Sequence, residues 1–213
     1  MKTIIFDMDG VIFDSEAVCL EAWQRIAKRL DLKGIEEAFL RCTGTTMVET
    51  RRIMLETYGD TIDYDELSKE VYEYFYEYET THGHLPIKPG AKEILSYLKE
   101  HGYKVGLASS TLIDTVTRQL KEAGLYDYFD VVIGGDMIKK SKPEPDIYLA
   151  ACEKIGTAPE EAYAVEDSYN GIRSAFSAGM KPIMVPDLLK PNDEMREKCF
   201  MIKDNLFDLM AVL

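Results

Sequence analysis

Short runs of β-branched and aliphatic residues alternate with longer amphipathic stretches along most of the chain. The short runs predict strands and the longer stretches predict helices. The predicted strands are Thr3–Phe6, Lys104–Ala108, Val131–Ile133, Ala162–Val165 and Pro182–Val185. The predicted helices are Ala91–Glu100, Leu112–Ala123, Asp146–Ile155, Gly171–Ala178 and Asn205–Val212. This alternation indicates an α/β fold with a Rossmann-like, doubly wound parallel sheet covered by helices on both faces.

One segment interrupts the alternation directly after the first strand. Between about Ser15 and Thr81 the apolar residues recur with helical spacing, without a convincing buried strand. Hinges are expected near residues 14–15 and within residues 82–88, where Gly83 and Pro86 interrupt regular secondary structure. We therefore expect a small α-helical cap over residues 15–87, inserted into a catalytic core formed by residues 1–14 and 88–213.

The last part of the predicted cap has an ambiguous periodicity. Four tyrosines alternate with other residues as in a strand, namely Tyr72, Tyr74, Tyr76 and Tyr78. Val71, Phe75 and Tyr78 fit one face of a helix equally well, and the surrounding glutamates and lysine favour the helix. We expect these aromatic side chains to pack within the cap.

Composition narrows the class of partner. The 213 residues include 25 basic and 38 acidic side chains, a formal net charge of −13. Such a field repels phosphate backbones, so we expect no nucleic-acid partner. No run approaches the ~18 apolar residues that span a bilayer, and the apolar N-terminal stretch is too short for the core of a signal peptide. We expect no membrane partner, a cytoplasmic location, and a monomer or weak dimer.

The strongest chemical signal is the segment Asp7-Met8-Asp9-Gly10-Val11 at the end of the first predicted strand. Residues two apart in an extended segment point the same way, so Asp7 and Asp9 should project together from the sheet edge where such folds place their sites. Two facing carboxylates repel each other unless a divalent cation or a shared proton intervenes. Gly10 allows a turn that a side chain would obstruct. Taken alone, the pair fits a solvated acidic turn equally well.

A second acidic pair favours a functional site. Glu166 and Asp167 follow the predicted strand Ala162–Val165. Parallel strands end at one edge of the sheet, so this pair can reach the same crevice as Asp7. Several converging carboxylates need a counter-charge, and ligands that are all oxygen suit a hard cation. Mg²⁺, which keeps several waters and binds substrate phosphate, fits best.

Two further strand ends supply groups that can hold an anion. Ser109 and Ser110 follow the strand Lys104–Ala108, where hydroxyls and backbone N–H groups open a helix and can bind a phosphate. Lys142 lies between prolines and acids just before the next helix. The acids across the crevice give this lysine a reason to point inward. A carboxylate can accept a phosphoryl group covalently, while a cation, Lys142 and Ser109 stabilise the charge on the transferring oxygens.

Four motifs in this order make the chain resemble the haloacid-dehalogenase-like superfamily, in its phosphatase and β-phosphoglucomutase-like branch. They are Asp7-Met8-Asp9-Gly10-Val11, Ala108-Ser109-Ser110, Ser141-Lys142-Pro143, and Val165-Glu166-Asp167-Ser168 continuing to Ala178-Gly179-Met180. The resemblance covers essentially the whole chain and implies a helical cap that closes over the substrate.

The resemblance also implies a role for each matching residue. Asp7 corresponds to the nucleophile that becomes an aspartyl phosphate, and Asp9 to the general acid and base, which also offers its backbone carbonyl to the metal. Ser109 and Lys142 correspond to phosphate-holding groups. Asp167 corresponds to a metal ligand, with Glu166 either a second ligand or the residue that orients a metal-bound water. The second aspartate distinguishes phosphate chemistry from dehalogenation, because a halide leaves without a proton.

The resemblance leaves two reactions open. The favoured function is a magnesium-dependent phosphatase of small phosphorylated metabolites, such as sugar phosphates, and the alternative is a β-phosphoglucomutase-type mutase. In the mutases a cap histidine falls where this chain has Cys19, and a cap arginine falls at about Met47, with Arg51 and Arg52 one turn further on. Specificity is expected from cap residues such as Thr45 and Thr46.

Two other classes of protein fit less well. Phospho-accepting receiver domains also gather acids, a hydroxyl and a lysine at sheet ends, but they are much shorter and lack an insertion after the first strand. A binding domain that has lost catalysis is disfavoured because all of the expected catalytic residues are present in the sequence.

Overall fold

A single parallel sheet forms the centre of the protein. The computed structural model describes residues 2–45 and 47–213, so Thr46 lies outside the described residues. In these residues six parallel strands are arranged in the order β3-β2-β1-β4-β5-β6. Their bounds are β1 Thr3–Phe6, β2 Lys104–Ala108, β3 Val131–Ile133, β4 Ala162–Glu166, β5 Lys181–Met184 and β6 Met201–Ile202.

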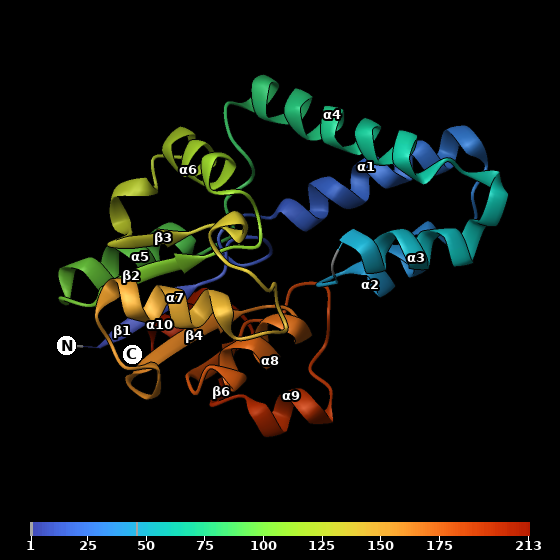
Figure 1. The fold of residues 1–213 in the computed structure, drawn as a ribbon. Helices are drawn as coiled ribbons and strands as arrows, with labels where there is room; N and C mark the ends of the chain where they lie inside the picture. Colours follow the sequence, from blue (N-terminus) through green and yellow to red (C-terminus); the bar gives the residue numbers. More distant parts are fainter. Residues whose placement is uncertain (1, 46) are drawn as a thin grey trace.

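Helices cover both faces of this sheet, as Figure 1 shows. Their bounds are α5 Ala91–Glu100, α6 Ile113–Glu122, α7 Asp146–Ile155, α8 Tyr169–Ser177, α9 Asp193–Lys198 and α10 Leu206–Met210. Side chains alternate between the two faces along β1: Ile4 and Phe6 pack in one cluster with α5, α6 and α10, whereas Ile5 packs with α7 and α8. Three short 3₁₀ turns complete the core, at Tyr126–Tyr128, Gly135–Met137 and Pro159–Glu161. This two-sided burial accounts for the continuous apolar runs of the strands.

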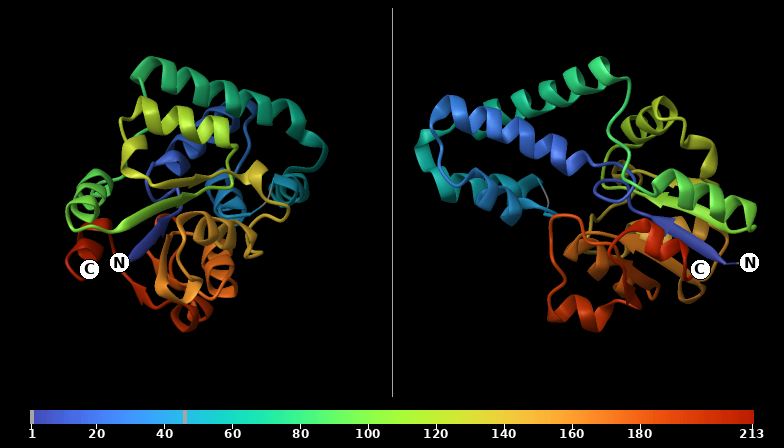
Figure 2. Two further views of the ribbon diagram at one scale, coloured as in Figure 1. Left: turned by 60° about the vertical axis from the view of Figure 1, so that its left-hand side comes forward. Right: turned by 180° about the vertical axis from the view of Figure 1, so that it is seen from behind.

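Four helices between β1 and α5 form a separate layer with its own apolar cluster. They are α1 Ser15–Leu30, α2 Ile35–Cys42, α3 Met47–Tyr58 and α4 Tyr64–His82, with a 3₁₀ turn at Gly59–Thr61. Trp23, Phe39 and Met54 are buried in their shared cluster. Figures 1 and 2 place these helices beyond the carboxyl-terminal edge of the sheet, on the opposite side from both termini. The division into core and cap at residues 14–15 and 87–88 stays a prediction.

Two polar contacts tie the helical layer to the sheet layer. Near the end of α4, the buried Glu79 accepts hydrogen bonds from Gln119 at 2.6 Å and Arg118 at 2.9 Å, both on α6. In the second connecting segment, Lys88 pairs with Asp187 at 2.7 Å and Asp14 at 3.3 Å. These contacts hold both connecting segments against the core.

The predicted fold class is confirmed, and β1, β2, β3, α5 and α7 have the predicted bounds. The tyrosine-rich segment is helical in α4. Helix α8 begins at Tyr169, two residues earlier than predicted, because the Ser168 hydroxyl accepts the N–H of Gly171 and caps the helix. The short α9 and β6 were not predicted, and β6 has only two residues at the sheet edge. None of the described helices is long and apolar enough to cross a membrane.

Candidate active site

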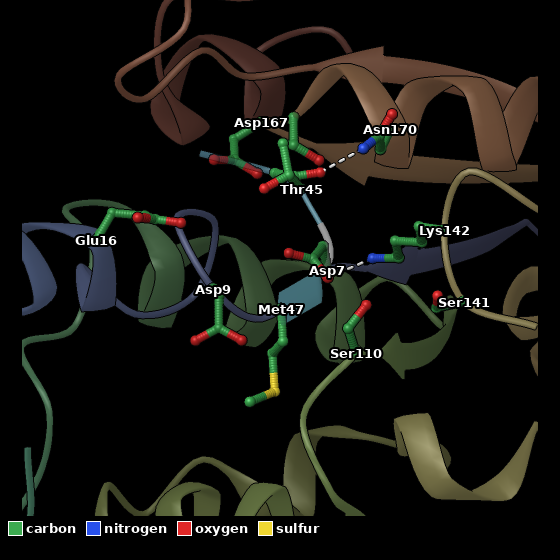
Figure 3. Close-up of a pocket in the computed structure, with 12 residues that line it drawn as sticks. Asp7, Asp9, Glu16, Thr45, Met47, Ser110, Ser141, Lys142, Asp167 and Asn170 are labelled. Carbon is green, nitrogen blue, oxygen red and sulfur yellow. Dashed lines mark hydrogen bonds and ion pairs between the residues drawn. The ribbon is translucent and has the colours of Figure 1, made fainter. Parts of the chain in front are cut away.

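The carboxyl ends of β1, β2 and β4 meet beneath the helical layer and form a cavity of about 410 Å³. Phe6 of β1 is in register with Leu107 of β2 and Val165 of β4, so the residues that follow these strands emerge together. Figure 3 shows the cavity with its lining side chains. Its described lining residues are Asp7, Asp9, Glu16, Gly44, Thr45, Met47, Ser110, Ser141, Lys142, Asp167, Ser168 and Asn170. Sequence elements more than 150 residues apart thus share one site.

Lys142 bridges two buried carboxylates at the floor of the cavity. Its Nζ donates to Oδ1 of Asp7 at 2.5 Å, to Oε1 of Glu166 at 2.7 Å and to the carbonyl of Ala108 at 3.2 Å. The three charged side chains are nearly inaccessible to solvent. Figure 3 shows Lys142 reaching toward Asp7. The three acceptors come from the ends of three strands, so the ammonium fixes their mutual positions.

Glu166 belongs to the floor rather than to the exposed wall of the cavity. It is fully buried, and besides Lys142 it accepts hydrogen bonds from the Tyr148 hydroxyl at 2.6 Å and from Ser168 at 3.2 Å. Three donors therefore fix the position of its carboxylate. No local sequence pattern marks Tyr148 as a site residue, because its position on α7 matches an ordinary core-facing residue.

Two glycines allow the acids to come this close. A Cβ at Gly171 would lie 1.9 Å from the carboxyl carbon of Glu166, and a Cβ at Gly10 would lie 2.3 Å from Oδ2 of Asp167. Gly10 also has φ +78°, a region that side chains disfavour. The glycine at the expected turn therefore leaves room for the Asp167 carboxylate.

Asp7, Glu166 and Asp167 form the one described group of carboxylates with the spacing of a metal site. Each offers an oxygen within 4.8 Å of the others, and all three are buried. No hydrogen bond from a described residue reaches the Asp167 carboxylate, and burial, followed by Glu166 and Asp7, holds its pKa well above the ordinary value. Burial also raises the pKa of Asp7 to about 8, against the opposing effect of Lys142. This donor set fits a hard divalent cation, which would relieve the repulsion.

Asp9 lines the cavity, but its carboxylate lies apart from this group. Ser15 donates to its Oδ1 at 2.8 Å, and Thr111 and Ser109 donate to its Oδ2 at 3.1 and 3.4 Å. The chain turns immediately after Asp7, because the Met8 carbonyl accepts the N–H groups of residues 12 and 13. Figure 3 shows the carboxylates of Asp7 and Asp9 directed to different parts of the cavity. Asp7 and Asp9 both line the cavity as expected, but their carboxylates do not point the same way.

The two candidate serines have different positions. Ser109 is fully buried, and its hydroxyl accepts the N–H of Thr111 at 3.0 Å. Ser110 lines the cavity, as does Ser141. The motif around Ser109 was sufficient to locate this loop, but which hydroxyl faces the cavity depends on the rotation of the backbone after β2.

The helical layer supplies the opposite wall. The loop before α3 is held to α8 by Asn170, whose amide donates to the Gly44 carbonyl at 2.5 Å. Thr45 lines the cavity, but its hydroxyl donates to the Cys42 carbonyl at 2.6 Å. Glu16, in the first turn of α1, also faces the cavity and was not predicted. Burial raises its pKa to about 7, with further contributions from Asp9 and Asp187.

The two arginines that follow Met47, Arg51 and Arg52, form ion pairs within the helical layer. Arg51 pairs with Asp65 at 3.2 Å, and Arg52 pairs with Glu49 and Glu56 on α3. Met47 lines the cavity, whereas Cys19, Arg51 and Arg52 are not among its described lining residues. Lys142 is the one basic side chain among those lining residues.

The family model, the curated relatives and the solved structures that match this chain agree with one another. A family model described as haloacid dehalogenase-like hydrolase matches residues 4–185. A phosphorylated carbohydrates phosphatase from Thermotoga maritima is 34% identical over 184 residues, covering 86% of this chain and 84% of the relative. A β-phosphoglucomutase from Bacillus subtilis is 30% identical over 84% of this chain and 81% of its own. A crystal structure from Thermotoga maritima, described as a candidate β-phosphoglucomutase, has a TM-score of 0.78 and 31% identity, with complete coverage of both chains.

The close approach of Gly171 to Glu166 leads to a first prediction. Gly171→Ala introduces a methyl group that cannot coexist with the Glu166 carboxylate, so Glu166 and its bridge to Lys142 must move. We expect destabilisation of about 1–3 kcal/mol by urea denaturation and a loss of catalytic activity of about tenfold or more. Ser177→Ala, at an exposed position of α8, is the control. A stable and fully active Gly171→Ala would contradict the geometry.

The raised pKa of Asp7 leads to a prediction on stability. Without a bound cation, the folded state holds a proton on Asp7 between about pH 4 and 8 that the unfolded chain has released, so stability falls as the pH rises through this window. In the presence of a chelator, we expect Tm to fall more steeply from pH 5 to 8 in the wild type than in Asp7→Asn. Thermal unfolding monitored by circular dichroism measures both slopes. Asp127→Asn, an exposed aspartate, should keep the wild-type slope, and equal slopes for all three would refute the prediction.

Proposed function

The chain belongs to the haloacid dehalogenase-like hydrolase family, and we propose that it is a magnesium-dependent phosphatase of small phosphorylated metabolites. The family match confirms the resemblance that the four sequence motifs indicated. The observation that carries the proposal is the Asp7 carboxylate at the cavity floor, held by Lys142 and close to Asp167. The carboxylate of Asp7, the ammonium of Lys142 and the acid Asp167 thus meet beneath a space large enough for a small substrate.

Asp7 acts in the proposal as the nucleophile that accepts the phosphoryl group. Lys142 donates a hydrogen bond to Oδ1 of Asp7. In the proposal, the second oxygen, Oδ2, therefore attacks phosphorus. Lys142 also places a positive charge where the oxygens of the transferring group gather. Ser110, at the cavity surface, and the N–H groups of its loop can hold the same oxygens. Attack splits the transfer into two steps, with an aspartyl phosphate between them.

Asp7 and Asp167, together with the backbone carbonyl of Asp9, would hold Mg²⁺, and Glu166 would either join them or orient a bound water. The contacts of Glu166 with Lys142, Tyr148 and Ser168 support the orienting role. The ion would supply positive charge against the phosphoryl oxygens and reduce the repulsion between the acids.

Asp9 is proposed as the general acid that protonates the departing oxygen and then as the base that activates water. Its carboxylate is poised at the cavity wall by hydroxyls of Ser15 and Thr111, which belong to the helical layer and to the sheet layer. In this proposal the side chain rotates away from these hydroxyls to reach the substrate oxygen. Such proton transfer contributes about 10²–10⁴-fold.

We favour hydrolysis over isomerisation because the cavity wall offers no second site for an anion among its described residues. A mutase must retain a bisphosphate while it turns over in the site, which requires a cation for the phosphate that is not reacting. By the resemblance, the mutase arginine corresponds to about Met47, and Arg51 and Arg52 are paired with acids on the helical layer. The relative named as a phosphatase supports this choice. The β-phosphoglucomutase alternative rests on the similarity to that enzyme.

Asp7→Asn tests the nucleophile. The amide keeps the shape of the side chain but lacks the anionic oxygen that attacks phosphorus, so we expect phosphate release to fall by several orders of magnitude. Folding should be preserved, because Lys142 keeps its contacts with Glu166 and the Ala108 carbonyl. The measurement is steady-state phosphate release with p-nitrophenyl phosphate, with Asp127→Asn as control. A rate above roughly a tenth of wild type would exclude Asp7 as the nucleophile.

A metal titration tests the cation. Activity should disappear in chelator and return with Mg²⁺, while Ca²⁺ should bind and inhibit, because it is larger and takes more ligands. Binding can be measured independently of activity: Mg²⁺ should raise the Tm of the wild-type protein. Asp167→Asn should lose this shift, whereas Asp127→Asn should retain it. Full activity in chelator would rule out the metal.

An isomerisation assay separates phosphatase from mutase. The protein is incubated with β-glucose 1-phosphate and a trace of β-glucose 1,6-bisphosphate, and both glucose 6-phosphate and free phosphate are measured. We expect free phosphate to exceed glucose 6-phosphate, because nothing in the described wall holds the bisphosphate against water. A known β-phosphoglucomutase serves as the positive control. Rapid formation of glucose 6-phosphate with little free phosphate would establish the mutase instead.

A further inference from the structure

The charges of the cavity wall are distributed unevenly between its floor and its outer part. The four acids among the described lining residues are Asp7, Asp9, Glu16 and Asp167, and the one base is Lys142. Lys142 is already engaged at the floor by two carboxylates. Above the floor, the described wall therefore presents a carboxylate and no cation. The part of a substrate that projects toward the helical layer meets this wall.

Glu16 is the acid that faces this outer space. It lies in the first turn of α1, next to Ser15, which holds Asp9. No hydrogen bond from a described residue engages its carboxylate, although the side chain is half-buried. Figure 3 shows Glu16 extending into the cavity from α1, on the opposite side from Lys142 and Ser141. Its oxygens are available as acceptors for a substrate.

The same outer space also contains one apolar side chain. Met47, at the start of α3, lines the cavity with a flexible thioether side chain. A group that fits between Met47 and Glu16 needs an apolar face for the thioether and hydrogen-bond donors for the carboxylate. A purely hydrocarbon group would bury Glu16 without a partner, which is costly. A second anionic group would meet the carboxylate with like charge.

We propose that Glu16 is a specificity-determining residue that selects phosphate monoesters whose remaining part is polyhydroxylated and carries no second negative charge. Hydroxyl groups of the substrate donate to the Glu16 carboxylate while the C–H face of the carbon chain or ring lies against Met47. Like-charge repulsion from Glu16 disfavours bisphosphates and phosphorylated sugar acids. This inference rests on the proposed phosphatase activity and adds the class of substrate to it.

The test compares compounds that differ in the charge of their outer part. Phosphate release by the full chain with Mg²⁺ is measured at pH 8, above the raised pKa of Glu16, so that its carboxylate is ionised. The substrates are glucose 6-phosphate, 6-phosphogluconate and glucose 1,6-bisphosphate. We expect kcat/KM of the wild type to favour glucose 6-phosphate by about tenfold or more over each anionic compound. Because each preference is a ratio within one protein sample, it does not depend on the fraction of active enzyme.

Variants assign this preference to Glu16. Glu16→Gln keeps an acceptor and removes the charge, so the ratio should fall toward one; Glu16→Lys should reverse it. Glu16→Met should raise KM for glucose 6-phosphate more than for p-nitrophenyl phosphate, which has no hydroxyl groups. Glu21→Gln removes the same charge from an exposed position of α1 and should keep the wild-type ratio.

Two results would overturn the inference. One is a wild type that hydrolyses 6-phosphogluconate as well as glucose 6-phosphate, and the other is a ratio that stays unchanged in Glu16→Gln and Glu16→Lys. The p-nitrophenyl phosphate assay separates these from a failure of the proposed function. Absence of phosphate release from every compound, including p-nitrophenyl phosphate, would overturn the phosphatase activity itself and the inference with it.

Discussion

The ammonium of Lys142, buried between Asp7 and Glu166, is the contact on which the rest of the site depends. Parallel strands that end at one edge bring several acids into a space with little solvent, where their mutual repulsion is strong. One lysine compensates two of them at 2.5 and 2.7 Å and leaves Asp167 without a compensating partner among the described residues. The remaining negative charge is what makes the site suitable for a divalent cation and, through that cation, for an anionic substrate. A net charge of −13 is compatible with such a substrate for the same reason.

This contact is supported by Tyr148, Gly171 and Gly10, which do not line the cavity, and by Ser168, which does. Glu166 is held by Tyr148 from α7 and by Ser168 from the turn before α8, so both helices on one face of the sheet set the position of Lys142. Gly171 makes room for Glu166, and Gly10 makes room for Asp167. Buried charges need both a partner and a close fit, because an unpaired one is expensive.

The helical layer contributes in a different way. It contacts the site through Ser15, which holds Asp9, and through the Gly44 carbonyl, which accepts a hydrogen bond from Asn170. Both contacts are between polar groups at the border of the two layers. The nucleophile, the lysine and the acids of the floor thus come from the sheet layer, whereas Glu16 and Met47 of the helical layer line the outer wall, where we propose that the substrate is selected.

The sequence by itself determined the alternation of strands and helices, the helical insertion, the strand ends that carry Asp7, Ser109 and Asp167, and the loop before α7 that carries Lys142. These follow from local patterns: apolar periodicity, turn residues, and the rule that parallel strands end at one edge. The sequence could not show that Asp9 turns toward Ser15 and Thr111, that Ser110 rather than Ser109 faces the cavity, or that Tyr148 and Glu16 belong to the site. These depend on backbone rotations of single residues and on contacts between segments far apart in the chain. A local pattern places a residue on an element, but only the packing of all elements decides which atoms meet.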